Sequence, residues 1–192
     1  IPRLCYHNDL PSHGSCRVCT VLVNGRPQTA CTQPVAEGMM VENTTEQLNN
    51  IRKDIIEMLF VEGNHFCMFC EKSGNCELQA LAYRFGITAP KYPYMFPKRD
   101  VDASHKDVFI DRNRCVLCGR CVTASNEVDG KHAFDFINRG IEKRVGVDAG
   151  DGLADTDVDI ADKAMDVCPV GAIIKKRVGF EVPIGKRKYD HQ

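Results

Sequence analysis

RCVLCGRCV, residues 114–122, is the stretch around which the rest of the chain is arranged. It contains Cys115, Cys118 and Cys121 with two residues between successive cysteines, so one tight turn presents three thiolates. A tetrahedral zinc site usually takes its cysteines in pairs from two separate knuckles. Three cysteines from one loop instead match three corners of an iron–sulfur cubane and leave one iron for a distant ligand. The stretch therefore predicts a [4Fe-4S] site, with a zinc ribbon as the alternative.

Cys168, in the stretch DVCPVGAI (166–173), is the candidate for the fourth ligand. Pro169 fixes φ and has no N–H group, so the chain can turn away from a cluster without burying an unpaired donor. In two-cluster bacterial ferredoxins, a cysteine of this kind follows the triplet after three residues and serves the other cluster. Here 46 residues intervene and no second such triplet exists, so we expect Cys168 to close the same cluster.

The overall composition excludes several functional classes. A chain of 192 residues with 43 % apolar content is long enough for one to three small domains. Its net charge of −1, with acids and bases interspersed, gives no electrostatic footprint for nucleic acid. No apolar run approaches a membrane span, and neither a signal peptide nor a lipidation motif is recognisable, so we expect a cytoplasmic protein.

The cysteines carry the remaining functional information. Eleven are present, and an odd number would leave one thiol unused in a disulfide framework. A metal-binding framework leaves none unused if a histidine completes the group of three. The groups are Cys5, Cys16, Cys19 and Cys31; then Cys67, Cys70 and Cys76; and finally Cys115, Cys118, Cys121 and Cys168.

The first group surrounds a hairpin signal. Residues 18–23 read as a largely buried strand, and Asn24-Gly25 is typical of a type I′ turn. The four cysteines follow the pattern C-x10-C-x2-C-x11-C, whereas plant-type ferredoxins use C-x4-C-x2-C and a later cysteine. We interpret the group as a [2Fe-2S] site on a β-grasp scaffold. That fold needs a hairpin and a helix before the ligand loop, so we expect part of the domain to precede Ile1.

A helical segment separates the first two groups. Thr44 and Gln47 fit a capping box, and Gly63 is placed to end the helix. The helix is expected to span 44–62, with one apolar face made of Leu48, Ile51, Ile55 and Leu59.

The middle group has the pattern C-x2-C-x5-C, which is one ligand short of a cubane. His65 lies two residues before Cys67 and is the nearest neutral nitrogen donor. A lone histidine is more often a polar turn residue, but the unfilled position favours His65 as the fourth ligand. A second helix with Leu78, Leu81, Ala82 and Phe85 on one side is expected to follow and to stop at Gly86.

The remaining segments are predicted to be structural. APKYPYMFPKR (89–99) reads as an extended connector whose aromatic residues cover a cluster pocket, rather than forming a stacking platform for bases. Residues 132–147 read as a hairpin about 138–140. The acidic run resembles the opening of a calcium loop but has Ile160 in place of the glycine, so we reject calcium. We expect a helix starting at 155–159 to carry Ala164 and Met165 toward Cys168.

These ligand sets indicate electron transfer rather than catalysis. Clusters saturated by protein ligands carry single electrons and have no open coordination position for a substrate. Neither a G-x-G-x-x-G dinucleotide motif nor a P-loop is present, and no cysteine is left over for a nucleophile, so no catalytic residue is expected. Four basic residues beside ligands either tune reduction potentials or are solvated surface charges. They are Arg17, Lys72, Arg114 and Arg120.

The order of these ligand sets resembles a known family. With EGNHFCMFCEKSGNCELQALAYRFG (62–86), CPVGAI (168–173) and VGFEVPIGKRKYD (178–190), nearly the whole chain resembles the small iron–sulfur subunit in the diaphorase part of bidirectional NAD-reducing [NiFe] hydrogenase. It is also similar to the N-terminal region of the large iron–sulfur subunit of respiratory complex I. In that relative the histidine has three residues between it and the first cysteine of its set, a position at which this chain has Gly63.

The resemblance implies an α+β chain with three cluster domains. They are a truncated β-grasp [2Fe-2S] domain at 1–43, a helical domain with one histidine and three cysteines holding a [4Fe-4S] cluster at 44–90, and a ferredoxin-like [4Fe-4S] domain with four cysteines at 91–192. The implied partners are a flavin-containing, NADH-oxidising subunit at the [2Fe-2S] end and the small and large [NiFe] hydrogenase subunits at the His65 end. The Cys115–Cys168 cluster would lie between them.

Two other classes of function stay open at this stage. The same relay could serve an NAD-linked molybdenum formate dehydrogenase, or the chain could be a fragment of complex I. The cysteines could also hold zinc in an interaction module. A visible spectrum distinguishes the last case, because zinc–thiolate sites are colourless.

Overall fold

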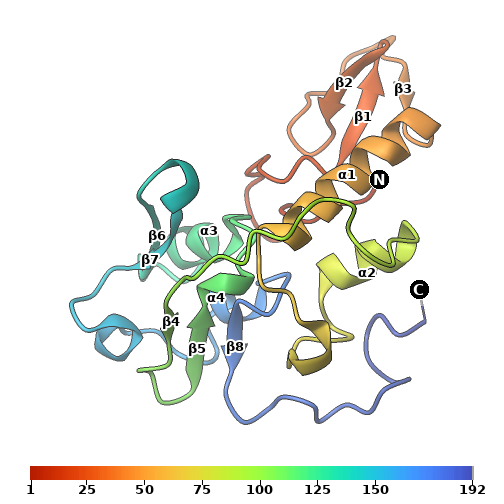
Figure 1. Cartoon of the computed structure of the whole chain (residues 1–192). Helices are drawn as coiled ribbons and strands as arrows, with labels where there is room; N and C mark the ends of the chain where they lie inside the picture. The colour runs from red at the N-terminus through yellow and green to blue at the C-terminus, as the bar shows by residue number, and fades with distance from the viewer. Residues whose placement is uncertain (192) are drawn as a thin grey trace.

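The computed structural model describes residues 1–191 and consists of short helices and strands arranged in three antiparallel sheets (Figure 1). The helices are α1 Glu46–Val61, α2 Glu77–Arg84, α3 Arg120–Glu127 and α4 Lys163–Asp166. The strands are β1 Thr20–Val23, β2 Arg26–Thr29, β3 Val41–Glu42, β4 Val101–Asp102, β5 Val108–Asp111, β6 Phe134–Ile137, β7 Arg144–Val147 and β8 Ile173–Lys175. The sheet orders are β2-β1-β3, β4-β5-β8 and β6-β7.

The N-terminal sheet is built on the expected hairpin. β1 is buried along its whole length and pairs with β2, with Thr20 opposite Thr29. Asn24 and Gly25 both have positive φ, of 48° and 77°, as a type I′ turn requires. The hairpin prediction is therefore confirmed, and the chain returns to Cys31 two residues after β2 ends.

Helix α1 differs from its prediction in two details. Its N-cap is Thr45 rather than Thr44, because the Thr45 hydroxyl accepts the Leu48 N–H at 3.2 Å. The buried face is also turned, since Arg52 and Ile56 are buried with Leu48. Arg52 is buried because its guanidinium donates to the Thr20 carbonyl at 2.6 Å and the Asn43 carbonyl at 2.7 Å. These contacts attach α1 to the N-terminal sheet.

Helix α2 agrees with its prediction. Leu78, Leu81 and Ala82 are buried, and the chain leaves the helix through Gly86 at a φ of +65°. The left-handed conformation is one that glycine adopts without steric cost, so the sequence marks the end of this helix correctly.

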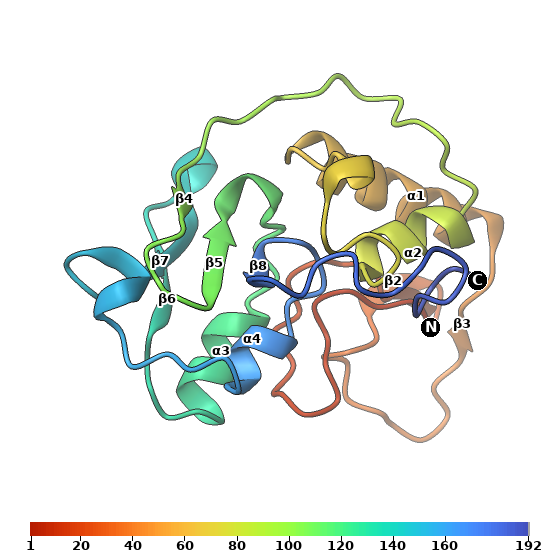
Figure 2. The same cartoon turned by 90° about the horizontal axis from the view of Figure 1, so that it is seen from below.

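The connector at 89–99 has no helix or strand and arches over the molecule between α2 and β4 (Figure 2). The prediction that its aromatic residues cover a cluster pocket is wrong for two of them. Tyr94 and Phe96 are exposed and stack on each other, with ring centroids 5.3 Å apart.

The C-terminal part contains the expected β6-β7 hairpin, in which Ile137 is opposite Arg144. Helix α4 is shorter than predicted and begins at Lys163 instead of 155–159. The reason is a distant cap: both oxygens of the Asp129 carboxylate accept N–H groups from Lys163 and Ala164 at 2.9 Å. Asp162 instead shapes the acidic loop that precedes α4. Its carboxylate accepts a hydrogen bond from the Lys131 ammonium at 2.8 Å.

Each of the three regions 1–43, 44–90 and 91–192 contains one cysteine group, and we call them the cysteine-bearing regions. Buried apolar side chains from all three form one continuous core. Leu4, Leu78 and Phe134 represent those regions, and each is almost fully buried. Among the described residues, no helix is both long enough and apolar enough to cross a membrane.

Candidate metal centres

The first cysteine group is gathered beside the N-terminal sheet. The Cys5 N–H donates to the Cys16 sulfur at 3.3 Å, and the Cys16 N–H donates to the Cys5 sulfur at 3.4 Å. Burial raises the pKa of Cys19, and the neighbouring Cys31 and Cys5 contribute to its electrostatic surroundings. The hydrogen bond from the Cys16 thiol lowers the pKa of Cys5 to about 5 and raises that of Cys16. Cys5 and Cys16 therefore lie in direct contact, as two ligands of one cluster require.

The group at 115–121 and 168 lines a single cavity. Cys115, Cys118, Cys121 and Cys168 share its wall with apolar side chains that include Ile110 and Val145. Leu117 and Gly119, with φ of 52° and 81°, turn the loop so that the three cysteines face the same space. The Leu117 N–H also donates to the Cys115 sulfur at 3.4 Å. All four cysteines expected from the sequence meet here.

Burial makes this cavity unfavourable for free thiolates. Burial raises the pKa of Cys115 to about 11, and it raises the pKa values of Cys118 and Cys121 further, with the neighbouring thiolates adding to the shift. Four negative charges in an apolar pocket need a compensating cation. Ferric and ferrous iron supply this charge and prefer thiolate ligands, so the donor set and its surroundings fit an iron–sulfur cluster.

The middle group lies at the start of α2. Cys67 begins a 3₁₀ helix that ends before Cys70, and Cys76 is the residue that precedes α2. Burial, followed by the charges of Cys67 and Cys70, raises the pKa of Cys76 to about 12. The three thiols therefore share one electrostatic environment.

His65 has the hydrogen bonding of a metal ligand. Its Nε2 atom is buried without a partner, while the other ring nitrogen donates to the Leu59 carbonyl. Burial and the nearby Arg114 charge lower its pKa to about 4, so the ring is neutral and Nε2 has a free lone pair. Metal-binding histidines typically donate their second ring nitrogen to a carbonyl in this way.

The position of the His65 ring explains why residue 63 is a glycine. A Cβ atom at Gly63 would lie 2.5 Å from His65 Nε2, so a side chain at position 63 and this ring cannot both be present. Gly63 also has no positive φ, so space for the ring accounts for it better than helix termination. The ring contacts Phe60 edge-on. Within residues 1–191 the ring makes no hydrogen bond to the thiols of Cys67, Cys70 and Cys76. In the same residues, no group of three His, Cys, Asp or Glu side chains is arranged to hold a single metal ion.

The 115–121 loop and the segment after Cys168 together touch both other cysteine-bearing regions. On one side the Ser15 hydroxyl donates to the Leu117 carbonyl at 3.2 Å. On the other side, a Cβ atom at Gly171 would lie 2.5 Å from the Cys70 sulfur, so the segment after Cys168 packs directly against the middle group.

The four basic residues beside ligands have different surroundings. Arg17 is exposed, as the surface-charge interpretation requires, and Lys72 is half-buried. Arg114 is mostly buried and donates to the Cys70 sulfur at 3.7 Å, and its acidic partners are Glu71 and Asp111. Arg120 is almost completely buried, with 3 % of its surface exposed. The surface-charge interpretation is therefore wrong for Arg114 and Arg120, whose side chains are mostly or almost completely buried.

Sequence reasoning missed Gly171 and Glu77. Glu77 accepts two hydrogen bonds from Arg120, and its own N–H donates to the Pro169 carbonyl at 2.8 Å. Both residues stand close to a cysteine in the sequence, but their partners lie in another cysteine-bearing region. No local pattern signals such a contact.

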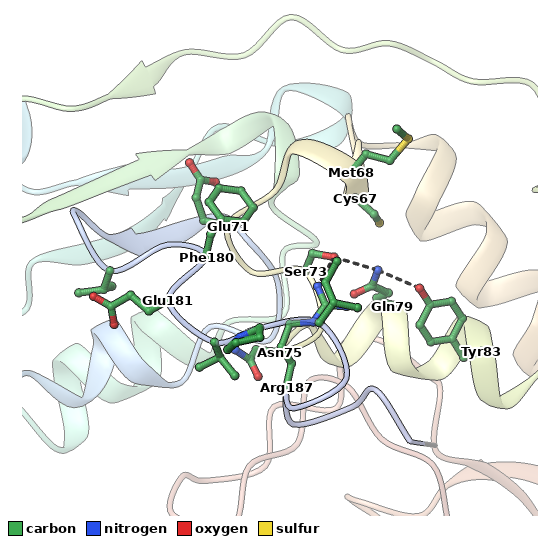
Figure 3. Close-up of a pocket in the computed structure, with 14 residues that line it drawn as sticks. Cys67, Met68, Glu71, Ser73, Asn75, Gln79, Tyr83, Phe180, Glu181 and Arg187 are labelled. Carbon is green, nitrogen blue, oxygen red and sulfur yellow. Dashed lines mark hydrogen bonds between the residues drawn. The ribbon is translucent and has the colours of Figure 1, made fainter.

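A cavity borders the middle group and opens toward the C-terminal segment (Figure 3). Cys67 and Met68 line one side, and Phe180 lines the other. Its polar side is ordered by Gln79, which donates to the Ser73 hydroxyl at 3.3 Å and to the Tyr83 hydroxyl at 3.1 Å. One sulfur-bearing residue of the middle group thus lies next to an open surface cavity.

Three family models match successive parts of the chain. A 2Fe-2S iron-sulfur cluster binding domain matches residues 1–46, and the iron-sulfur binding region of NADH-ubiquinone oxidoreductase-G matches 52–91. The ferredoxin-like domain of NADH-quinone oxidoreductase subunit 3 matches 106–174. A mixed chain with one 2Fe-2S domain and 4Fe-4S-binding regions is therefore confirmed.

The whole chain is similar to the gamma subunit of the NAD-reducing hydrogenase HoxS of Cupriavidus necator, with 44 % identity over 100 % of this chain and 82 % of the relative. The chain belongs to this family of hydrogenase gamma subunits. A chain in the crystal structure of an NAD+-reducing [NiFe]-hydrogenase in the H2-reduced state matches with a TM-score of 0.96 and 48 % identity, over 100 % of this chain and 82 % of that chain. The family resemblance found in the sequence is confirmed.

The gamma-subunit family is also similar in sequence to parts of larger proteins. The NADP-reducing hydrogenase subunit HndD of Solidesulfovibrio fructosivorans is 35 % identical over 95 % of this chain and 32 % of the relative. The mitochondrial NADH-ubiquinone oxidoreductase 78 kDa subunit of Candida albicans is 33 % identical over 94 % of this chain and 25 % of the relative. The chain therefore spans about a third or less of these two relatives.

Proposed function

We propose that this chain relays electrons between a flavin-containing subunit that reacts with NAD(H) and a [NiFe] hydrogenase module with a small and a large subunit. The observation that carries the proposal is that the segments holding the last ligand set contact both other cysteine-bearing regions, the 115–121 loop through Leu117 and the segment after Cys168 through Gly171. A protein with three linked ligand sets has the arrangement that a relay needs. The similarity to a hydrogenase gamma subunit over 82 % of its length supports this complex over the alternatives.

We propose three clusters, in three domains. Cys5, Cys16, Cys19 and Cys31 hold a [2Fe-2S] cluster in a partial β-grasp domain at 1–43, and His65 with Cys67, Cys70 and Cys76 holds a [4Fe-4S] cluster at 44–90. Cys115, Cys118, Cys121 and Cys168 hold a second [4Fe-4S] cluster in a ferredoxin-like domain at 91–192. The close pairing of Cys5 with Cys16 and the shared cavity of the last four cysteines support these sets.

The residues of this chain bind and insulate the clusters, and the chemistry on substrates belongs to other subunits. An iron–sulfur cluster with all iron positions ligated by protein supplies one-electron transfer. The apolar wall formed by Ile110 and Val145 keeps water away from the last ligand set. Arg114 donates to the Cys70 sulfur, and hydrogen bonds to sulfur raise the reduction potential of such a cluster.

We propose that the middle cluster faces the hydrogenase module. Met68, Phe69 and Phe180 are large apolar side chains with well over half of their surface exposed near the cavity at Cys67. Exposed apolar clusters of this size are typical of protein contact surfaces. We also propose a cytoplasmic location, because thiolates that hold iron need a reducing compartment.

Metal analysis tests the proposed function directly. The full chain, separated from its partners and purified without oxygen, is expected to hold about ten iron atoms and no stoichiometric zinc. The complex is expected to reduce NAD with hydrogen, and the isolated chain is expected to oxidise neither hydrogen nor NADH. Zinc in place of iron would support an interaction module. Co-purification with a molybdenum subunit that oxidises formate would keep the relay and overturn the hydrogenase assignment.

His65→Ala is expected to disturb the middle cluster alone. The other two sets have four cysteines each, so their EPR signals should persist at wild-type intensity. His65→Cys restores a ligand and should recover a cluster at this site with a lower reduction potential, because thiolate adds a negative charge. His132→Ala, at a histidine outside the three groups, is the matched control. Three unchanged EPR signals in the alanine variant would show that another ligand completes the site.

A further inference from the structure

Arg120 stands between two proposed ligands, Cys118 and Cys121, at the start of α3, and only 2 % of its side chain is exposed. Its guanidinium has five N–H groups, and five hydrogen bonds use them. Nε donates to the Cys5 carbonyl at 3.3 Å, and Nη2 donates to the Tyr6 carbonyl at 2.9 Å. Nη1 donates to the Val167 carbonyl at 3.1 Å, and both Nη atoms donate to the Glu77 carboxylate at 2.7 Å.

The residues that accept these hydrogen bonds are a proposed ligand or its direct neighbour in the sequence, and they include one from each of the three groups. Cys5 and Tyr6 belong to the first group. Glu77 directly follows Cys76 of the middle group, and Val167 directly precedes Cys168. One side chain of the 115–121 loop therefore connects backbone or side-chain atoms next to all three ligand sets. None of the other hydrogen-bonded side chains in residues 1–191 does this.

We propose that Arg120 is a positioning residue that fixes the separations between the three clusters and so sets the rate at which electrons pass between them. The inference rests on the proposed function and goes beyond it by naming the residue responsible. Electron tunnelling slows exponentially with distance, so small shifts between ligand sets change the relay rate without removing a cluster. A guanidinium suits the task because its donors are fixed in a plane, whereas a lysine ammonium offers three donors from one point.

An ordinary buried ion pair is the competing explanation, and Arg112 is the control for it. Arg112 is 4 % exposed, donates from Nε to the Val145 carbonyl at 2.7 Å and pairs with Asp100 at 2.8 Å. The atoms that accept hydrogen bonds from the Arg112 side chain all lie in residues 91–192. Arg112 therefore does not connect segments that hold different clusters. Loss of Arg112 tests the effect of removing a buried arginine, and loss of Arg120 tests the effect of removing the connection.

The experiment compares Arg120→Lys, Glu77→Gln and Arg112→Lys in the purified complex. Three quantities are measured for each: iron content, magnetic interaction between reduced clusters by EPR, and the ratio of hydrogen-driven NAD reduction to the two dye-linked partial activities. Arg120→Lys is expected to keep its iron, to weaken the magnetic interaction and to lower the activity ratio about ten-fold. Arg112→Lys should leave the interaction and the ratio at wild-type values.

Glu77→Gln keeps the experiment decisive if Arg120→Lys fails to retain its clusters. It removes one acceptor oxygen and the negative charge but leaves the arginine in place, so a smaller change in the same direction is expected. Wild-type magnetic interaction and activity ratio in an iron-loaded Arg120→Lys or Glu77→Gln complex would overturn the inference. An equal fall in Arg112→Lys would overturn it too. Absence of iron or of coupled activity from the wild-type complex would instead refute the proposed function.

Discussion

Cys118→Ser is expected to lower hydrogen-driven NAD reduction by the complex by about 100-fold or more, because it removes a ligand of the cluster that contacts both neighbours. Serine is close to cysteine in size, but its hydroxyl does not ionise to a ligand as a thiol does. The loop that holds Cys118 touches the first region through Leu117, and Gly171 touches Cys70 of the middle region. Loss of this cluster therefore interrupts the relay at its centre.

The partial reactions give the control for this variant. Hydrogen oxidation with a dye and NADH oxidation with a dye should stay at wild-type rates, because neither needs electrons to cross the central cluster. Thr123→Ser, in helix α3 directly after this loop and away from the cavity, should leave the coupled rate unchanged. If the coupled rate persisted in Cys118→Ser after its EPR signal was lost, electrons would have to bypass this cluster, and the proposed order of clusters would be wrong.

Glu77→Ala is expected to lower the free energy of unfolding of the iron-loaded chain by about 3 kcal/mol. The alanine leaves the Arg120 guanidinium, which is 2 % exposed, without its charged partner. Removal of one member of a buried pair costs about 3–5 kcal/mol, and the lower end applies because 26 % of the Glu77 side chain is exposed to solvent. Urea unfolding followed by circular dichroism measures the change.

Glu127→Ala provides the comparison for this measurement. Glu127 is exposed at the end of α3, so its loss should change the free energy of unfolding by less than about 0.5 kcal/mol. If Glu77→Ala and Glu127→Ala both lowered the free energy of unfolding by a similarly small amount, water would be able to solvate Arg120 once Glu77 is absent. The fully bonded guanidinium would then contribute little to the stability of the junction between the three regions.

The local elements are predictable wherever neighbouring residues determine the conformation. Asn24-Gly25 adopts positive φ at both positions, and Gly86 ends α2, because these residues tolerate the left-handed region that the turns require. The predicted start of α1 differs by one residue, since Thr44 and Thr45 both fit a cap and only the folded chain selects between them. Helix α4 is predicted too early because its cap, Asp129, is distant in the sequence.

The sequence by itself determined the hairpin, the first two helices and the family, and it indicated the three proposed ligand groups, because spacing and turn residues act over a few positions. Only the tertiary structure decided which of the arginines beside the cysteines are buried. Arg17 directly follows one cysteine and Arg120 directly precedes another, yet Arg17 is exposed and Arg120 is buried with five acceptor contacts. The difference arises because the acceptors of Arg120 come from residues up to 115 positions away, and chain folding alone brings them to one guanidinium.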